Sequence, residues 1–182
     1  MVAAESLRTE RLILRQWRDS DVAPFAVMNA DPVVMEYFPA TLSAAETVAM
    51  IARIRAGFAA NDMGLWALEL PGEAALIGYA GLWPVTFEAP FAPAVEIGWR
   101  LARPFWGRGL ATEASRAALA DGFGRLGLKE IVSFTVPANA RSLAVMERLR
   151  MRRDPAGDFE YPNLPVGHAL RPHVLYRIGA ED

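Results

Sequence analysis

The sequence predicts one α/β domain. Segments with the alternating pattern of strands are interleaved with segments of helical spacing along the whole chain, and no linker, repeat or low-complexity stretch separates them. The 182 residues, 53% of them hydrophobic, suffice for one substantial core and are few for two. We therefore treat residues 1–182 as a single domain.

The N-terminal part contains one strand pattern and two short helical patterns. Side chains alternate between two faces over residues 11–17, which is typical of a strand. Aspartates then provide caps for a short helix over 22–29, and Pro32 stands at a first helical position before one or two turns over 33–37.

A capping box marks the longest helix of this half. Ser43 and Glu46 have the spacing at which each side chain can bond the other's backbone N–H, and apolar residues at helical spacing continue to Ala60. Two strands, 65–70 and 75–85, follow with turns between them and are predicted to form an antiparallel meander.

The loop over 86–93 is unusually apolar for a connection, because it carries Phe87 and Phe91. We expect it to cap the core, and the alternative is a wall of a substrate pocket. The remaining segments are predicted in this order: a strand over 94–101, a helix over 113–126 ending before Gly127, a strand over 129–136, a helix capped by Asn139, a short strand over 151–154, a long loop over 155–171 and a final strand over 172–178.

Two glycines, Gly107 and Gly109, stand where the strand over 94–101 gives way to the next helical pattern. Glycine lets the backbone turn tightly and approach a ligand, and the start of a helix offers unpaired N–H groups with a partial positive charge. An anion such as a phosphate fits such a site. The alternative is a strand-to-helix turn without a ligand.

Two nucleotide-binding motifs do not match this stretch. A dinucleotide fingerprint needs a small residue at Thr112 and an acidic residue at the end of the next strand, whereas Glu130 begins that strand. The phosphate loop of ATPases ends in Gly-Lys-Ser/Thr, and Lys129 is the only lysine of the chain.

The run over 106–114, Trp-Gly-Arg-Gly-Leu-Ala-Thr-Glu-Ala, instead resembles the pyrophosphate loop of the GNAT N-acetyltransferases. Trp106 replaces the usual Arg or Gln of that loop, as in the branch of ribosomal-protein alanine acetyltransferases. A second block, over 136–149, resembles the family's Asn-x-x-Ser segment with a later Leu, and Leu7–Leu12 resembles its opening strand.

The resemblance implies a fold, a co-substrate and a binding site. The fold would be a mixed, twisted sheet of about seven strands with about four helices, in which the strands over 94–101 and 129–136 splay apart and receive the pantetheine arm of acetyl-CoA. The cofactor-binding core would span about 94–151. Its expected contacts are Ile97, Arg103, Trp106, Gly107, Arg108, Gly109, Leu110, Ala111, Thr112, Asn139 and Ser142.

Transfer of an acetyl group to an amine needs a base, donors for the developing oxyanion and help for the departing thiolate. Glu96 is the candidate base, with an outward-facing residue or an arginine partner as the alternative. The resemblance gives Ser142 the position near the thiol, and the N–H of Ile97 is the candidate oxyanion donor. Asn139 is expected both to cap its helix and to touch the pantetheine arm or the acceptor.

The resemblance places the acceptor amine between the segments 33–41 and 155–173, and Tyr161, His168 and Tyr176 are more distant candidates for proton transfer. The acceptor could be a protein N-terminus or a small molecule. A non-catalytic acyl-CoA-binding module is the competing interpretation, and a nucleotide-binding protein is disfavoured by the motif mismatches.

Composition limits the partners. A net charge of −2 with no basic block gives no reason to expect nucleic acid, and the absence of cysteine with only two histidines argues against a metal site. No apolar run is long enough for a membrane span, and residues 1–5 do not begin a leader peptide. We expect a cytoplasmic monomer or homodimer.

Overall fold

The computed structural model describes residues 6–181, so the expectation for residues 1–5 lies outside the described part of the chain. Its main sheet runs in the order β1-β2-β3-β4-β5-β6-β9-β7, with β8 paired to β9. The strands are β1 (Ser6–Arg8), β2 (Ile13–Arg15), β3 (Leu65–Leu70), β4 (Ala74–Pro84), β5 (Val95–Leu101), β6 (Glu130–Thr135), β7 (Arg152–Arg153), β8 (Phe159–Glu160) and β9 (Pro172–Gly179).

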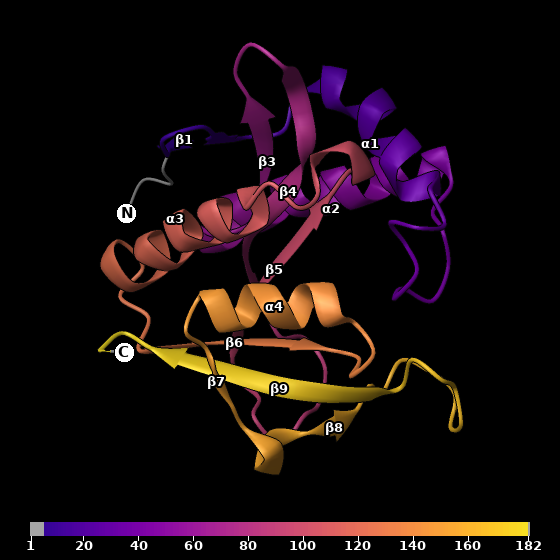
Figure 1. The fold of residues 1–182 in the computed structure, drawn as a ribbon, viewed down its shortest axis with the longest axis vertical. Coiled ribbons are helices and arrows are strands. Elements are labelled where there is room, and N and C mark those ends of the chain that lie inside the picture. The colour runs from indigo at the N-terminus through magenta and orange to yellow at the C-terminus, as the bar shows by residue number, and fades with distance from the viewer. Residues whose placement is uncertain (1–5, 182) are drawn as a thin grey trace.

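The described residues form four α-helices, which cover the two faces of this sheet (Figure 1). They are α1 (Val22–Ala30), α2 (Ala44–Asn61), α3 (Leu110–Gly124) and α4 (Ala140–Arg148), and short 3-10 turns lie at Asp19–Asp21, Arg103–Phe105 and Pro155–Gly157. In the view of Figure 1, α3 and α4 lie in front of the sheet, whereas α1 and α2 lie behind it. The predicted single α/β domain with a mixed sheet and four helices is confirmed.

The capped helices follow the prediction closely. The Ser43 hydroxyl accepts from the Glu46 N–H at 3.2 Å, and the Glu46 carboxylate accepts from the Ser43 N–H at 2.8 Å, which completes the capping box of α2. At α4 the Asn139 side-chain oxygen accepts from the Ser142 N–H at 3.2 Å. These caps supply partners for N–H groups that a helix start leaves unpaired.

Two predictions for the N-terminal part are wrong. The strand expected over 11–17 is shorter, because the chain first forms β1 and turns back at 9–12 to form β2. Residues 32–37 form turns rather than a helix. The segment is fixed by tertiary bonds instead, since Glu36 pairs with Arg141 at 2.6 Å and the Tyr37 hydroxyl donates to the Ala138 carbonyl at 3.1 Å.

The loop over 86–93 caps the core, as predicted. Phe91 is buried against Val132 and Leu175, and Phe87 packs at the edge of the same cluster. Neither phenylalanine lines the large cavity described below.

The sheet opens between β5 and β6. These strands run parallel but are in register at one pair only, Glu96 with Val132. On its other side, β5 pairs with β4 over seven consecutive residues, and β6 pairs with β9 over six. The predicted splay is therefore present as a wedge that widens from Glu96 toward the carboxyl end of β5.

Candidate functional site

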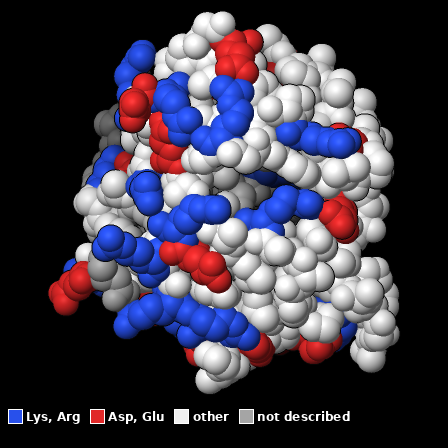
Figure 2. Space-filling view, viewed as in Figure 1, with Lys and Arg blue, Asp and Glu red and all other residues white. Residues whose placement is uncertain are grey.

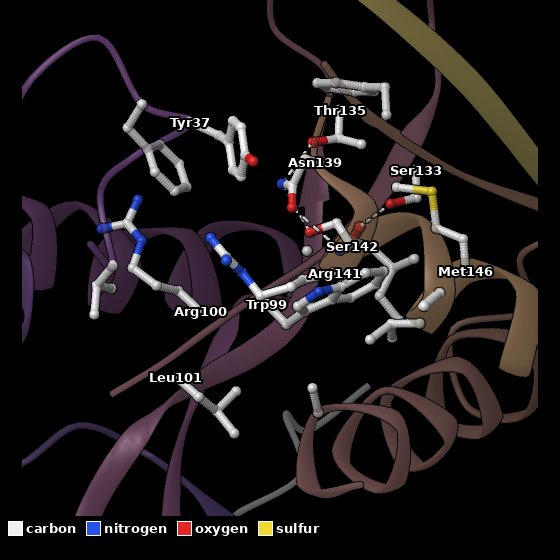
Figure 3. A pocket seen from close by; sticks show the side chains of 18 of the residues that line it. Tyr37, Trp99, Arg100, Leu101, Ser133, Thr135, Asn139, Arg141, Ser142 and Met146 are labelled. Atoms are coloured by element: carbon white, nitrogen blue, oxygen red, sulfur yellow. Dashed lines mark hydrogen bonds between the residues drawn. The ribbon is translucent and has the colours of Figure 1, made fainter. Parts of the chain in front are cut away.

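A cavity of about 880 Å³ lies in this wedge. Its walls come from β5, β6, the loop before α3 with the start of that helix, α4 along most of its length, segment 31–43 and the loop after β8. Figure 3 shows Ser133, Thr135, Asn139 and Ser142 on one side of the cavity and Tyr37 and Arg100 on the other. Figure 2 shows the face that carries α3 and α4, where Lys and Arg side chains surround a central hollow.

The loop before α3 has the backbone that the glycines predicted. Gly107 and Gly109 have φ values of 70° and 77°, which other residues rarely adopt, and Gly109 is the N-cap of α3. Leu110 is buried beneath the loop and fixes the start of the helix in the core. Leu110, Ala111 and Thr112 line the cavity. Their N–H groups, the first of α3, have no acceptors within the helix.

The β1–β2 turn holds this loop in place. The Glu113 carboxylate accepts from the Thr9 hydroxyl at 2.6 Å and from the Arg11 N–H at 2.9 Å, and it forms an ion pair with the Arg11 guanidinium at 2.6 Å. Arg11 also donates to the Arg108 carbonyl at 3.0 Å. The opening motif of the sequence thus acts as a brace for the helix start, across about a hundred residues of chain.

The two arginines predicted to reach phosphate oxygens do not line the cavity. Arg103 is exposed on the turn that follows β5. Arg108 forks onto the Glu73 carboxylate with bonds of 2.6 and 2.8 Å, and this pairing aims its side chain at the β3–β4 turn. The backbone of the loop, together with Trp106, Gly107, Gly109, Leu110, Ala111 and Thr112, supplies the cavity wall instead.

The β5 edge of the wedge carries backbone groups of odd-numbered residues. Even-numbered residues at both ends of β5 bond back toward β4, since the Ala94 carbonyl accepts from Val85 and the Ala102 N–H donates to Ile77. Alternation then turns Ile97 and Trp99 toward β6, and the buried Ser133 hydroxyl donates to the Ile97 carbonyl at 3.0 Å.

Ile97, the predicted oxyanion donor, thus lies at the apex of the wedge, next to the single registered pair. The Trp99 N–H is the next one along this edge of β5. It lies beyond Glu96 and Val132, the one pair in register between β5 and β6 in the described residues. The register favours Trp99 as the backbone donor that an extended ligand would meet first.

The start of α4 forms a small polar network on the β6 side. The Asn139 amide donates to the Thr135 hydroxyl at 2.9 Å and to the Ser142 hydroxyl at 3.0 Å, while its oxygen caps the helix. Because the Ser142 oxygen accepts from Asn139, its own proton is directed to another acceptor. Ser142, Asn139 and Thr135 all line the cavity.

Glu96 lines the cavity from the apex of the wedge. No ion pair joins Glu96 to an arginine within residues 6–181, and its side chain is half-buried. Burial raises the pKa of its carboxyl group from 4.5 to about 7. A carboxylate with this pKa is half deprotonated at neutral pH and suits a general base.

This raised pKa predicts a pH-dependent stability. The folded state binds the Glu96 proton more tightly than the unfolded state, so the associated stability is complete below about pH 4.5 and is lost as the pH rises through about 7. Glu96→Gln, which stays neutral, is expected to match the wild type near pH 4 and to exceed its unfolding free energy above pH 7, by at most about 3.5 kcal/mol.

Chemical denaturation at both pH values measures this difference. The matched control is Glu88→Gln, which removes an exposed carboxylate from the loop before β5. Its unfolding free energy should differ from that of the wild type by the same amount at both pH values. An unfolding free energy of Glu96→Gln that tracks the wild type from pH 4 to 8 would show that the carboxyl is not buried.

The acceptor-side expectations are met in part. Val34, Tyr37, Phe38 and Pro39 of the predicted segment 33–41 line the cavity. From 155–173 the cavity is lined by Tyr161, Leu164, Leu170 and His173.

Of the three distant proton-transfer candidates, only Tyr161 lines the cavity. His168 accepts from the Leu170 N–H at 3.1 Å within its own loop. Tyr176 packs against the apolar cluster that contains Met146 and Leu149.

Sequence reasoning missed several cavity residues. Arg100 and Ser133 line the wall but belong to no motif, and Arg141 stands at an unspecified position of the Asn-x-x-Ser segment. One signal for Arg100 was available, because Glu96, Gly98 and Arg100 alternate on one face of an otherwise apolar strand. The others depend on which segments meet across the fold.

Within residues 6–181, no group of three or more His, Asp or Glu side chains is arranged to hold a metal ion. Among the same residues, no helix is both long and apolar enough to cross a membrane.

Comparison with known proteins matches residues 11–152 to the family model described as "Acetyltransferase (GNAT) domain". The chain is 28% identical over 176 residues to the uncharacterized N-acetyltransferase YnaD of Bacillus subtilis, covering 97% of this chain and 98% of that protein.

Two solved structures are also similar. The GNAT-family acetyltransferase of Bacillus anthracis has a TM-score of 0.80 at 27% identity and covers 97% of this chain and 99% of its own. Mycobacterium smegmatis RimJ, in complex with CoA-disulfide, has a TM-score of 0.74 at 24% identity and covers 97% and 86%. At the latter identity the likeness concerns the fold alone.

Proposed function

Because the chain belongs to the GNAT acetyltransferase family, we propose that it transfers the acetyl group of acetyl-CoA to a primary amine by direct attack in a ternary complex. GNAT enzymes use acetyl-CoA and acetylate amine acceptors such as those of ribosomal proteins. The observation that carries the proposal is the wedge cavity, which has a loop of backbone N–H groups suited to an anion at its open end and a half-buried carboxyl at its apex.

The residues present fit a CoA thioester. The left-handed glycines and the start of α3 provide N–H groups for a pyrophosphate. The similarly folded RimJ of Mycobacterium smegmatis was solved in complex with CoA-disulfide. The open β5 edge offers Trp99 backbone groups to an extended arm, with Ile97 at its inner end. The cofactor-binding part would span about 94–151.

In the proposed reaction, Glu96 accepts a proton from the attacking amine, directly or through water. The amine nitrogen bonds the carbonyl carbon, and the N–H of Trp99 stabilises the oxygen that gains charge. The carbon–sulfur bond then breaks, and the Ser142 hydroxyl donates its hydrogen bond to the leaving thiolate. The chain contains no cysteine that could carry an acyl group between two half-reactions.

Replacing Ser142 separates this role from a purely structural one. Since the Ser142 oxygen accepts only a side-chain bond from Asn139, which keeps Thr135 as its other partner, Ser142→Ala is expected to change the melting temperature little. We expect kcat and kcat/KM to fall together by about tenfold or more, because hydrogen bonds to charged groups contribute about 1.5–3 kcal/mol.

Steady-state kinetics and thermal melting on the same preparation measure both effects. Ser142→Thr keeps a hydroxyl and should recover most of the lost rate. A destabilised but fully active Ser142→Ala variant would assign the hydroxyl to the helix rather than to the thiolate.

The competing function is a non-catalytic acyl-CoA-binding module. An acceptor screen distinguishes the two, with purified protein, acetyl-CoA and panels of free amino acids, peptide N-termini and antibiotic amines, monitored by CoA release and by mass spectrometry of the acceptor. Amine-dependent release with an acetylated product supports the enzyme. Saturable acetyl-CoA binding with release at the buffer rate for every panel supports the module.

A further inference from the structure

Arg100 is a buried cation without a counterion. Its side chain is only 7% exposed, and it forms no ion pair with any carboxylate in the described part of the chain. The Nη1 atom donates to the Asn29 side-chain oxygen at 2.7 Å, while Nε is buried without any partner. Burying an unpaired charge is costly, so such a residue marks a site whose partner arrives with a ligand.

The guanidinium is held rigidly in the cavity wall. Asn29 is itself fixed, because its amide donates to the buried Thr47 hydroxyl at 3.2 Å and so joins α1 to α2. Phe38 covers one face of the guanidinium at 3.9 Å from its ring centre, and Tyr79 lies at 5.4 Å. These contacts leave Nη2 and the second N–H of Nη1, at the end of the guanidinium, as the part that can still receive a ligand.

Arg100 shares a face of β5 with Glu96. Residues 96, 98 and 100 alternate with Ile97, Trp99 and Leu101, which pack toward α3 and the core. Between the two charged residues lies Gly98, where an added Cβ would meet no atom within 4 Å. The face of β5 that points away from α3 thus carries the Glu96 carboxyl at one end, unfilled space over Gly98 in the middle and the Arg100 guanidinium at the other end.

We propose that Arg100 binds a carboxylate of the acceptor, so that the substrate class of this enzyme is an amine that also carries a carboxylate group. This inference rests on the proposed function, since it places the amine of the same molecule beside Glu96. A guanidinium forks onto a carboxylate through two parallel N–H bonds, which fixes both position and orientation. Along the strand the two charged residues are about 13 Å apart, so acceptors of different length should differ in fit.

Calorimetry on the protein saturated with CoA tests the inference without turnover. The first arm titrates α-, γ- and ε-amino carboxylic acids, each paired with its carboxamide. The second arm titrates dipeptides with Asp or Asn as the second residue, which distinguishes a free amino acid from a peptide as the source of the carboxylate. In at least one pair the carboxylate is expected to bind about ten- to a hundredfold more tightly, the usual effect of charge-assisted hydrogen bonds.

Variants assign that discrimination to Arg100. Arg100→Gln is expected to bring the affinity ratio close to one, and Arg100→Lys, which keeps a charge without the fork, is expected to give an intermediate ratio. The matched control is Arg141→Gln, which removes a second cavity arginine that already pairs with Glu36, and it should preserve the ratio. Melting curves verify folding of each variant, and if Arg100→Gln does not fold, the lysine variant decides.

Equal affinities within every wild-type pair would overturn the inference, as would undetectable binding up to about 10 mM, well above the range of an ordinary specific contact. A ratio that persists in Arg100→Gln would overturn it too. Acetyl transfer to an uncharged amine in the same preparations distinguishes these results from a failure of the proposed function, because that reaction needs no carboxylate.

Discussion

Glu96→Gln is expected to lower kcat/KM at pH 7 by about two to three orders of magnitude, within the usual contribution of a positioned general base. The wild type should gain activity as the pH rises through about 7, because its carboxyl group acts only when deprotonated. In the variant this limb should disappear, and the deficit should shrink at high pH, where the amine is already free.

Steady-state rates between pH 5.5 and 9.5, at saturating acetyl-CoA, measure this profile. Glu88→Gln is the matched control, because it removes an exposed carboxylate from the loop before β5, and its profile should overlay the wild type. A Glu96→Gln profile with the same shape and height as the wild type would mean that water or another group takes the proton.

Gly109→Val is expected to weaken CoA binding by at least about tenfold, since a non-glycine residue at φ near 77° is strained by about 1–3 kcal/mol and relaxation would turn the loop away from its ligand. The fold should survive, because the nearest atom to an added Cβ is the Arg11 guanidinium at 3.6 Å.

Gly127→Val provides the matched control for this variant. Gly127 has a φ of 66°, and an added Cβ there would meet no atom within 4 Å, but it lies in the turn before β6 and does not line the cavity. Both variants should lose similar stability in melting experiments, whereas calorimetry should find weaker CoA binding only for Gly109→Val. Equal affinities in the two variants would make the loop before α3 a structural turn.

Local signals predicted most of the fold. The helices with side-chain caps at Ser43 and Asn139, and the strands with alternating patterns, lie within a few residues of their predicted bounds. Segment 33–37 was predicted as helical turns because Pro32 resembles a helix start, but so short a helix has little stability of its own. Its conformation depends on Glu36 contacting α4 and on Tyr37 contacting the turn just before α4, about a hundred residues away.

The site was predictable where backbone determines it. Glycines at 107 and 109 indicate a left-handed loop from sequence alone, and the structure has it. Side-chain assignments depend on distant partners. Arg108 faces Glu73 because the β3–β4 turn lies beside the loop, and Arg100 lies in the cavity because α1 brings Asn29 to it. Neither contact can be predicted from the residues next to these arginines in the sequence.

A crystal structure of the protein with bound CoA is the most direct test of the account. We expect pyrophosphate oxygens within hydrogen-bonding distance of the N–H groups between Gly107 and Thr112, the pantetheine arm along the β5 edge at Trp99, and the sulfur beside Ser142. Glu96 should then face the sulfur end from the apex of the wedge, with an open path from the Arg100 side. CoA bound outside the wedge, or with its sulfur remote from both Glu96 and Ser142, would contradict the proposed site and mechanism.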